Sequence, residues 1–160
     1  MINAPVTRDK ESMTYTIENA YFEEIEHTAD TGLKSHAPTL PQLYANMAFG
    51  MYHLVLTIGT GKQIKSRNIS VAGNSLEELL VNWLSELNYL LSVHHFITST
   101  FSDLAIASAH TGYILKAVLQ GWETRDYKKH IKAEIKAVTY HQLSVEKGET
   151  GYSAQVIFDI

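Results

Sequence analysis

The stretch from Ser75 to Leu91 constrains the fold of this chain most strongly, because it joins a helix start signal to a long apolar stripe. Ser75 and Glu78 have the spacing of a capping box, which satisfies free N–H groups at a helix N-terminus. Eight large apolar residues then recur at helical spacing: Leu76, Leu79, Leu80, Trp83, Leu84, Leu87, Leu90 and Leu91. We expect a helix through Ser92 whose stripe packs against a sheet or another helix, rather than a cofactor site.

A second helix is predicted after Thr39, a plausible N-cap with Pro41 in the first turn and Gln42 at the capping-box position. Its apolar stripe contains Leu40, Leu43, Met47, Met51, Leu54 and Val55. The segment 59–61 contains two glycines and is expected to end this element.

Most of the remaining chain is rich in β-branched and aromatic residues, which is typical of strands. Expected strands are 15–28, 32–36, 64–72, 93–99, 101–109, 113–120, 133–145 and 152–160, with turns at 110–112 and 147–151. The polar segment 121–130 is expected to be a loop, either solvated surface or a contact surface. The pattern predicts an α+β domain with two helices packed on one mainly antiparallel sheet. Residues 1–14 are predicted to be a flexible leader, and residues 15–160 a single domain.

Composition narrows the possible chemistry. The absence of cysteine excludes disulfides, thiolate catalysis and cysteine-ligated metals. The net charge of −4, from 13 basic and 17 acidic residues, argues against strong direct binding of nucleic acid. The polar N-terminus does not resemble a signal peptide, and no apolar run is long enough to span a membrane. The cytoplasm is therefore the expected location, with no membrane contact.

Asp30 is the first candidate functional residue. It follows His27 at the end of an expected strand and precedes Gly32, which is expected to favour a sharp turn. One interpretation is a turn aspartate that bonds its own backbone. Another is the Asp-Thr-Gly tripeptide of aspartic proteases, which would need a second carboxylate. The polar pair before Asp30 and the two long helices argue against such a hydrolase.

The C-terminus offers further acidic groups. Asp159 interrupts an apolar strand on the face opposite Val156, Phe158 and Ile160, and the carboxylate of Ile160 adds another negative charge. If this strand end lies near Asp30, three hard oxygen groups converge, which suits Ca²⁺ or Mg²⁺ rather than zinc. The alternative is a frayed polar terminus.

The stretch 134–141 contains two further candidates, Lys136 and His141. On a strand, Lys136 would lie on the face of Val138, and His141 on the opposite one. Lys136 is as readily explained by a solvated face, and His141 by partial burial, so the sequence assigns neither a chemical role.

Taken together, these stretches resemble the archease family. The matching segments are Glu26-His27-Thr28-Ala29-Asp30-Thr31-Gly32-Leu33, the helix segment 79–87, Glu134-Ile135-Lys136-Ala137-Val138-Thr139-Tyr140-His141 and Phe158-Asp159-Ile160. The resemblance spans residues 20–160. One departure is Trp122, which separates Gly121 from Glu123 where the family has adjacent Gly and Glu, so no role is carried onto Glu123.

The resemblance implies a fold related to the SHS2 module and a small accessory protein, not an enzyme. Such proteins activate an RtcB-type RNA ligase in tRNA splicing or RNA repair, promoting guanylylation of the ligase and repeated turnover. GTP and RNA would be met only through the ligase.

By the same resemblance, Asp30, Asp159 and Ile160 would bind a metal, usually Ca²⁺, with Mg²⁺ or Mn²⁺ as alternatives. No residue is expected to be catalytic, while His27, Lys136 and His141 fall in family motifs as candidate partner contacts. Two other functions stay open from the residues alone: a metal-binding scaffold without a ligase role, and a hydrolase built on Asp30.

Overall fold

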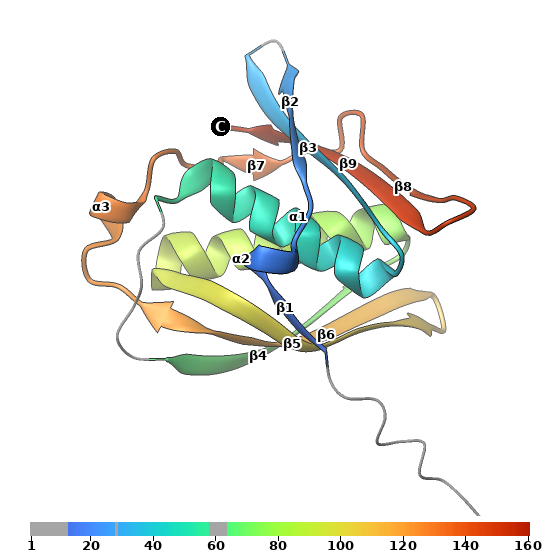
Figure 1. Ribbon diagram of the computed structural model, residues 1–160, viewed down its shortest axis with the longest axis horizontal. Coiled ribbons are helices and arrows are strands. Elements are labelled where there is room, and N and C mark those ends of the chain that lie inside the picture. The colour runs from blue at the N-terminus through green and yellow to red at the C-terminus, as the bar shows by residue number, and fades with distance from the viewer. Residues whose placement is uncertain (1–12, 28, 58–63) are drawn as a thin grey trace, which may run out of the picture.

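The computed structural model describes residues 13–27, 29–57 and 64–160 (Figure 1). Two long helices, α1 (Leu40–Val55) and α2 (Leu76–His94), form the centre. A one-turn 3-10 helix, η2 (Ile17–Asn19), and a short helix, α3 (Tyr127–His130), lie outside them.

Both predicted helix starts are confirmed. The Ser75 hydroxyl accepts a hydrogen bond from the Glu78 backbone N–H at 3.0 Å, and the Thr39 hydroxyl accepts one from Gln42 at 3.3 Å. The Glu78 carboxylate accepts from the Asn74 N–H, one residue before the position that a capping box requires. Each helix therefore begins where its side-chain cap satisfies otherwise free donors.

One antiparallel sheet has the strand order β1-β5-β6-β4. Its strands are β1 (Thr14–Thr16), β4 (Lys65–Gly73), β5 (Phe96–Ala109) and β6 (Gly112–Glu123). The predicted turn at 110–112 joins β5 and β6. Of the two expected strands 93–99 and 101–109, residues 96–109 form the single strand β5, whose register shifts twice against β6, while Val93 and His94 belong to the end of α2.

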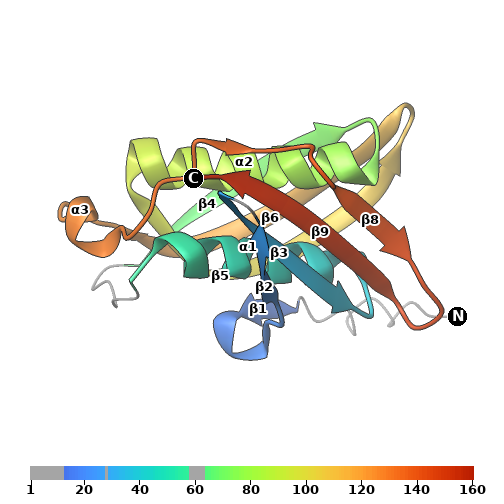
Figure 2. The same ribbon diagram turned by 90° about the horizontal axis from the view of Figure 1, so that it is seen from above.

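The second antiparallel sheet joins segments from both halves of the chain, in the order β2-β3-β9-β7, with β8 also paired to β9 (Figure 2). Its strands are β2 (Glu23–His27), β3 (Asp30–Ala37), β7 (Ala137–Val138), β8 (Ser144–Lys147) and β9 (Tyr152–Asp159). Strand β9 therefore lies at the centre of this sheet, between strands separated from each other by about a hundred residues.

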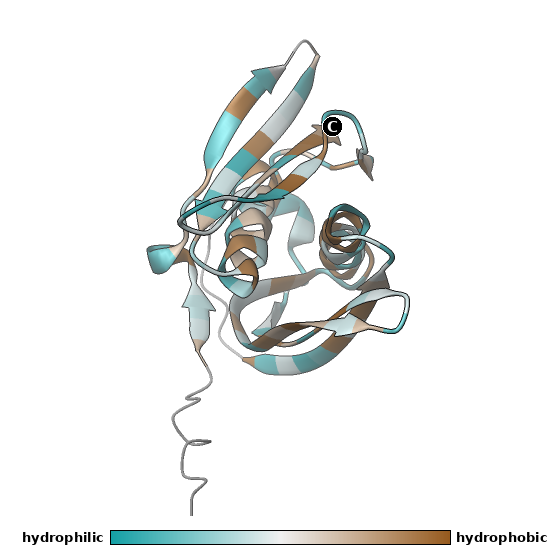
Figure 3. Ribbon diagram, turned by 90° about the vertical axis from the view of Figure 1, so that its right-hand side faces the viewer, coloured by the Kyte–Doolittle hydropathy of each residue, from teal (hydrophilic) through white to brown (hydrophobic). Residues whose placement is uncertain are grey.

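The α+β class is confirmed, but the helices lie between two sheets and not on one (Figure 3). The reason is visible in α1, where every residue from Leu43 to Tyr52 is buried. A helix buried on all sides needs cover on two faces, whereas the apolar stripe in its sequence marks only one face. The core contains Leu33, Tyr44, Trp83, Phe101 and Phe158, none of them exposed.

Three predicted elements differ from the structure. The expected strand 15–28 divides at η2, so that β1 and β2 join different sheets. The expected strand 133–145 forms only the short strand β7 and the first residues of β8. The expected loop 121–130 contains the end of β6 and α3. Period-two patterning cannot show where a strand leaves one sheet for another.

Of the predicted leader, residues 1–12 lie outside the described residues, and Thr14 already begins β1. Within the described chain, none of the helices combines the length and apolar character that a membrane crossing requires.

Candidate metal centre

The start of β3 and the end of β9 bring Asp30 and Asp159 together. Thr31 pairs with Phe158 at the end of the antiparallel register, and continuing that register by one position would set Asp30 opposite Asp159. Directly opposed residues lie on the same face, with Cβ atoms about 5 Å apart. On the other side of β9, Ala137 of β7 opposes Asp159. A methyl side chain there leaves space around the Asp159 carboxylate.

At this end of β9 the burial stops at Asp159. Val156 and Phe158 are fully buried against the helices and Ile157 is only 1% exposed on the opposite face, whereas Asp159 on the face of Ile157 is exposed. The side chain of Ile160 is partly buried against the core, as the predicted alternation requires. This anchoring places the main-chain oxygens of Ile160 next to Asp159. The alternative prediction of a frayed terminus therefore does not fit this segment.

The prediction that Gly32 forms a sharp turn is wrong. Gly32 lies within β3 opposite Ile157, and the residue with a left-handed backbone is Ala29, at φ 65°. A Cβ atom on Gly32 would lie 2.7 Å from Cδ1 of Ile157 and 3.1 Å from the Val156 carbonyl oxygen. A larger residue here would force the Ile157 side chain to move, because the strands pack closely two residues from Asp30.

His27 pairs with Asp30 in the register of β2 and β3, which places it at the same end of the sheet. Its side chain lies outside the described part of the structure. Lys136 is also brought to this end, because its backbone N–H donates to the Asp159 carbonyl at 2.8 Å, and its side chain is exposed.

His141 lies away from Asp159, in the exposed turn that follows β7. Its N–H donates to the Thr139 hydroxyl at 3.3 Å, and that hydroxyl donates to the Ile157 carbonyl at 2.8 Å. The structure therefore assembles Asp30, Asp159, Ile160 and Lys136 at one sheet end, which we call the acidic tip.

Two helix asparagines that the sequence analysis missed hold this sheet in place. Asn46 of α1, only 2% exposed, donates to the Ser35 hydroxyl at 3.1 Å, and thereby fixes β3. Asn88 of α2 donates to the Ile135 carbonyl at 3.1 Å, just before Lys136. A polar residue within an apolar helix pattern was the available sequence signal, because a buried amide needs a partner.

The donors at the acidic tip are carboxylate and main-chain oxygens, which are the ligands of hard cations. Like charges directly opposed across two strands repel, and a cation between them would relieve that repulsion. Among the described residues, no group of three or more His, Asp or Glu side chains is placed to hold a metal. A site here has two carboxylate side chains and would need main-chain oxygen as well.

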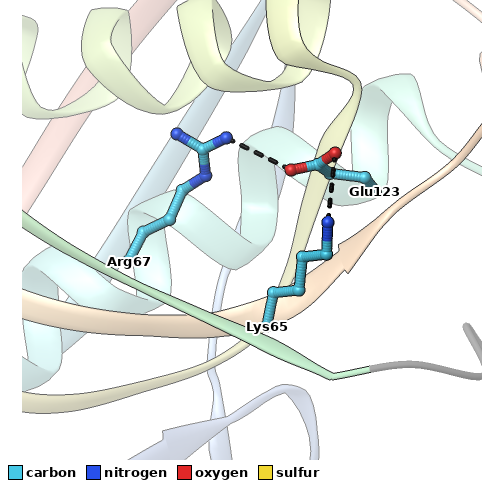
Figure 4. A network of polar contacts seen from close by, with 3 residues as sticks. All are labelled: Lys65, Arg67 and Glu123. Atoms are coloured by element: carbon cyan, nitrogen blue, oxygen red, sulfur yellow. Dashed lines mark hydrogen bonds and ion pairs between the residues drawn. The ribbon is translucent and has the colours of Figure 1, made fainter.

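Glu123 belongs to a different charged cluster (Figure 4). Its carboxylate lies 3.5 Å from Lys65 Nζ and 3.3 Å from the Arg67 guanidinium. The neighbouring Lys65 and the hydrogen bond from Arg67 lower the pKa of Glu123. Arg67 also lies over the Phe96 ring, 5.1 Å from its centroid. These contacts give Glu123 a structural role in joining β4 to β6.

Comparison with known proteins identifies the family. The family model described as "Archease protein family (MTH1598/TM1083)" matches residues 22–160. The chain is a member of the archease family. It is 36% identical to "Protein archease" of Methanosarcina acetivorans over 139 residues, which are 87% of this chain and 95% of that protein. It is 31% identical to "Protein archease" of Pyrococcus abyssi over 140 residues, 87% of this chain and 98% of that protein.

A solved structure supports the archease fold independently. The solution structure of Methanobacterium thermoautotrophicum protein 1598 matches with a TM-score of 0.71 at 24% identity, covering 87% of this chain and 98% of that one. The archease match begins at Phe22, so it includes the whole five-stranded sheet and both long helices. Strand β1 lies outside the matched region.

Proposed function

We propose that this archease is an accessory activator of an RtcB-type RNA ligase, promoting guanylylation and multiple turnover of the ligase in tRNA splicing or RNA repair. The observation that carries the proposal is the opposition of Asp30 and Asp159 at the end of the five-stranded sheet, in a chain of this family. In this proposal the acidic tip, loaded with a cation, is presented to the ligase.

The acidic tip suits contact with a partner because it is rigid and accessible at once. Asp159 is exposed, while its neighbour Phe158 is fully buried in the core. The adjacent strands are fixed to both helices through Asn46 and Asn88. A site built on regular strands holds its geometry better than one on a loop.

The proposed ligands are the carboxylates of Asp30 and Asp159 with a main-chain oxygen of Ile160. Ca²⁺ is the preferred ion because it accepts irregular sets of oxygen ligands, and Mg²⁺ and Mn²⁺ are the alternatives. The bound cation would supply positive charge that helps position triphosphate or metal in the neighbouring active site. Lys136, and His27, which pairs with Asp30 in the β2–β3 register, are the proposed partner contacts beside it.

The proposed role is not catalytic. The ligase carries the covalent chemistry, and GTP and RNA are met through it. Cytoplasmic location is part of the same proposal, since RNA splicing and repair take place among soluble partners.

The test is ligation by the RtcB-type ligase of the same organism, with GTP and RNA in excess over enzyme, with and without this protein. We expect the protein to raise the number of turnovers per ligase and the fraction of guanylylated ligase. Chelation of divalent cations bound to this protein before mixing should reduce the stimulation. Ligation that is equal with and without the protein would refute the proposed function.

A further inference from the structure

Charge is distributed unevenly over the molecule, and the basic residues gather at the end of α2 and around α3. Six of the chain's 13 basic residues are Lys65, Arg67, Arg125, Lys128, Lys129 and Lys132. Only Glu123 and Asp126 offset them within residues 121–132. Glu123 is already compensated by Lys65 and Arg67. A chain with a net charge of −4 therefore carries a locally cationic surface, which we call the basic face.

The contacts of α3 hold the basic face together. The Tyr127 ring stacks on His95 at the end of α2, with centroids 4.3 Å apart and planes inclined by 4°. The Lys132 N–H donates to the Val55 carbonyl of α1 at 2.8 Å. Lys128, Lys129 and Lys132 are all exposed on this anchored segment.

A polar cavity of about 390 Å³ lies within the basic face. Its lining consists of Lys65, His94, His95, Glu123, Thr124 and Arg125. There is no aliphatic side chain in that lining to receive the apolar anchors that dominate binding between proteins. Lysine, arginine and histidine are instead the groups that bind phosphate.

Exposed aromatic rings border the cavity. Tyr89 of α2 is 48% exposed, and its ring meets that of His94 edge-on with centroids 5.4 Å apart. Proteins that bind single-stranded nucleic acid combine a positive groove with aromatic rings on which unpaired bases stack. An acidic peptide would bind the lysines through its carboxylates but would make no stacking contact with the aromatic rings.

We propose that the basic face is a binding site for single-stranded RNA, with Lys128, Lys129 and Arg125 on phosphates and with Tyr89 and His94 stacking on bases. The site is separate from the acidic tip, and RNA binding there does not require that the protein activate a ligase. The protein would then bind RNA directly, weakly and in a salt-sensitive manner, in addition to any contact with RNA through the ligase.

The experiment measures the fluorescence anisotropy of a labelled 12-nucleotide single-stranded RNA on titration with the full chain. With the three phosphate contacts of Lys128, Lys129 and Arg125, the dissociation constant should rise about twentyfold between 50 and 200 mM salt. The double variant Lys128→Glu, Lys129→Glu should reduce that dependence to about threefold. Tyr89→Ala should weaken binding about fivefold or more without changing the salt dependence.

Matched variants separate this site from general charge effects. The double variant Lys116→Glu, Lys147→Glu reverses two exposed lysines elsewhere and should bind RNA much as the parent does. An equal loss in that control would overturn the proposal. So would equal affinity for duplex RNA, or equal displacement of RNA by a polyglutamate peptide of the same charge. Failure to stimulate the ligase would contradict the proposed function and leave this site unaffected.

Discussion

The two charged clusters on the two sheets are built on opposite principles. On the four-stranded sheet, the Glu123 carboxylate of β6 forms ion pairs with Lys65 and Arg67 of the neighbouring strand β4. On the five-stranded sheet, the register opposes Asp30 to Asp159, two groups of the same charge. The first cluster is compensated by its own side chains, whereas in our proposal the second is compensated by a cation.

This difference separates structural charge from functional charge. An exposed ion-pair network such as that of Glu123 contributes little to stability and needs no ligand. Carboxylates opposed across two strands repel each other, and a cation between them would reduce that repulsion. Sites where like charges are held close together are often functional. The contrast between the two clusters therefore favours the acidic tip over Glu123 as the functional site.

The largest expected effect comes from separating the strands that carry the two aspartates. Gly32→Val would place branched carbons where even a Cβ lies 2.7 Å from the buried Ile157 side chain. We expect a loss of about 3 kcal/mol in the free energy of unfolding, measured by urea denaturation, together with loss of cation binding.

Gly148→Val is the control for this substitution, because a Cβ on Gly148 would have only the Gly151 carbonyl oxygen within 4 Å, at 3.8 Å. It should cost less than a third as much. Equal costs at the two glycines would show that close strand packing at Gly32 is unimportant.

The next effect sharpens the comparison by removing one of the opposed charges. With Ca²⁺ at a hundred times its dissociation constant, the parent should gain about 2.7 kcal/mol in the free energy of unfolding. Asp30→Asn should abolish that gain. Thermal unfolding with and without Ca²⁺ measures it. A Ca²⁺-induced gain that survives in Asp30→Asn would place the cation elsewhere.

The smallest effect concerns the compensated cluster. Since Lys65 and Arg67 lower the pKa of Glu123 in the folded state, its contribution is present above pH 4.5, the ordinary value, and is lost as pH falls through the lowered pKa. Glu123→Gln should therefore be slightly less stable at neutral pH and fall less steeply between pH 5 and pH 3. Urea midpoints across that range test this, and parallel curves for the two proteins would disprove it.

The sequence predicts much of this molecule because its signals are local. Ser75 and Thr39 mark both helix starts, and alternation correctly places Phe158 inside and Asp159 outside. The sequence also indicates Asp30 and Asp159 as candidate site residues. The register of β3 and β9, continued by one position, sets them opposite each other.

The remaining features depend on contacts between distant segments. The division of 15–28 between two sheets follows from partners at residues 30–34 and 100–102, which no local pattern encodes. The role of Gly32 depends on Ile157, and that of Asn88 on Ile135. The ion pairs of Glu123 with Lys65 and Arg67 join positions more than fifty residues apart.

The central claim is that the acidic tip, and not the compensated cluster, activates the ligase. The most direct measurement is multiple-turnover ligation by the RtcB-type ligase with Asp30→Asn, Asp159→Asn and Glu123→Gln, each removing one negative charge. The account predicts that the two aspartate variants lose at least nine-tenths of the stimulation and that Glu123→Gln keeps it. Full stimulation by both aspartate variants, or equal loss in all three, would contradict the account.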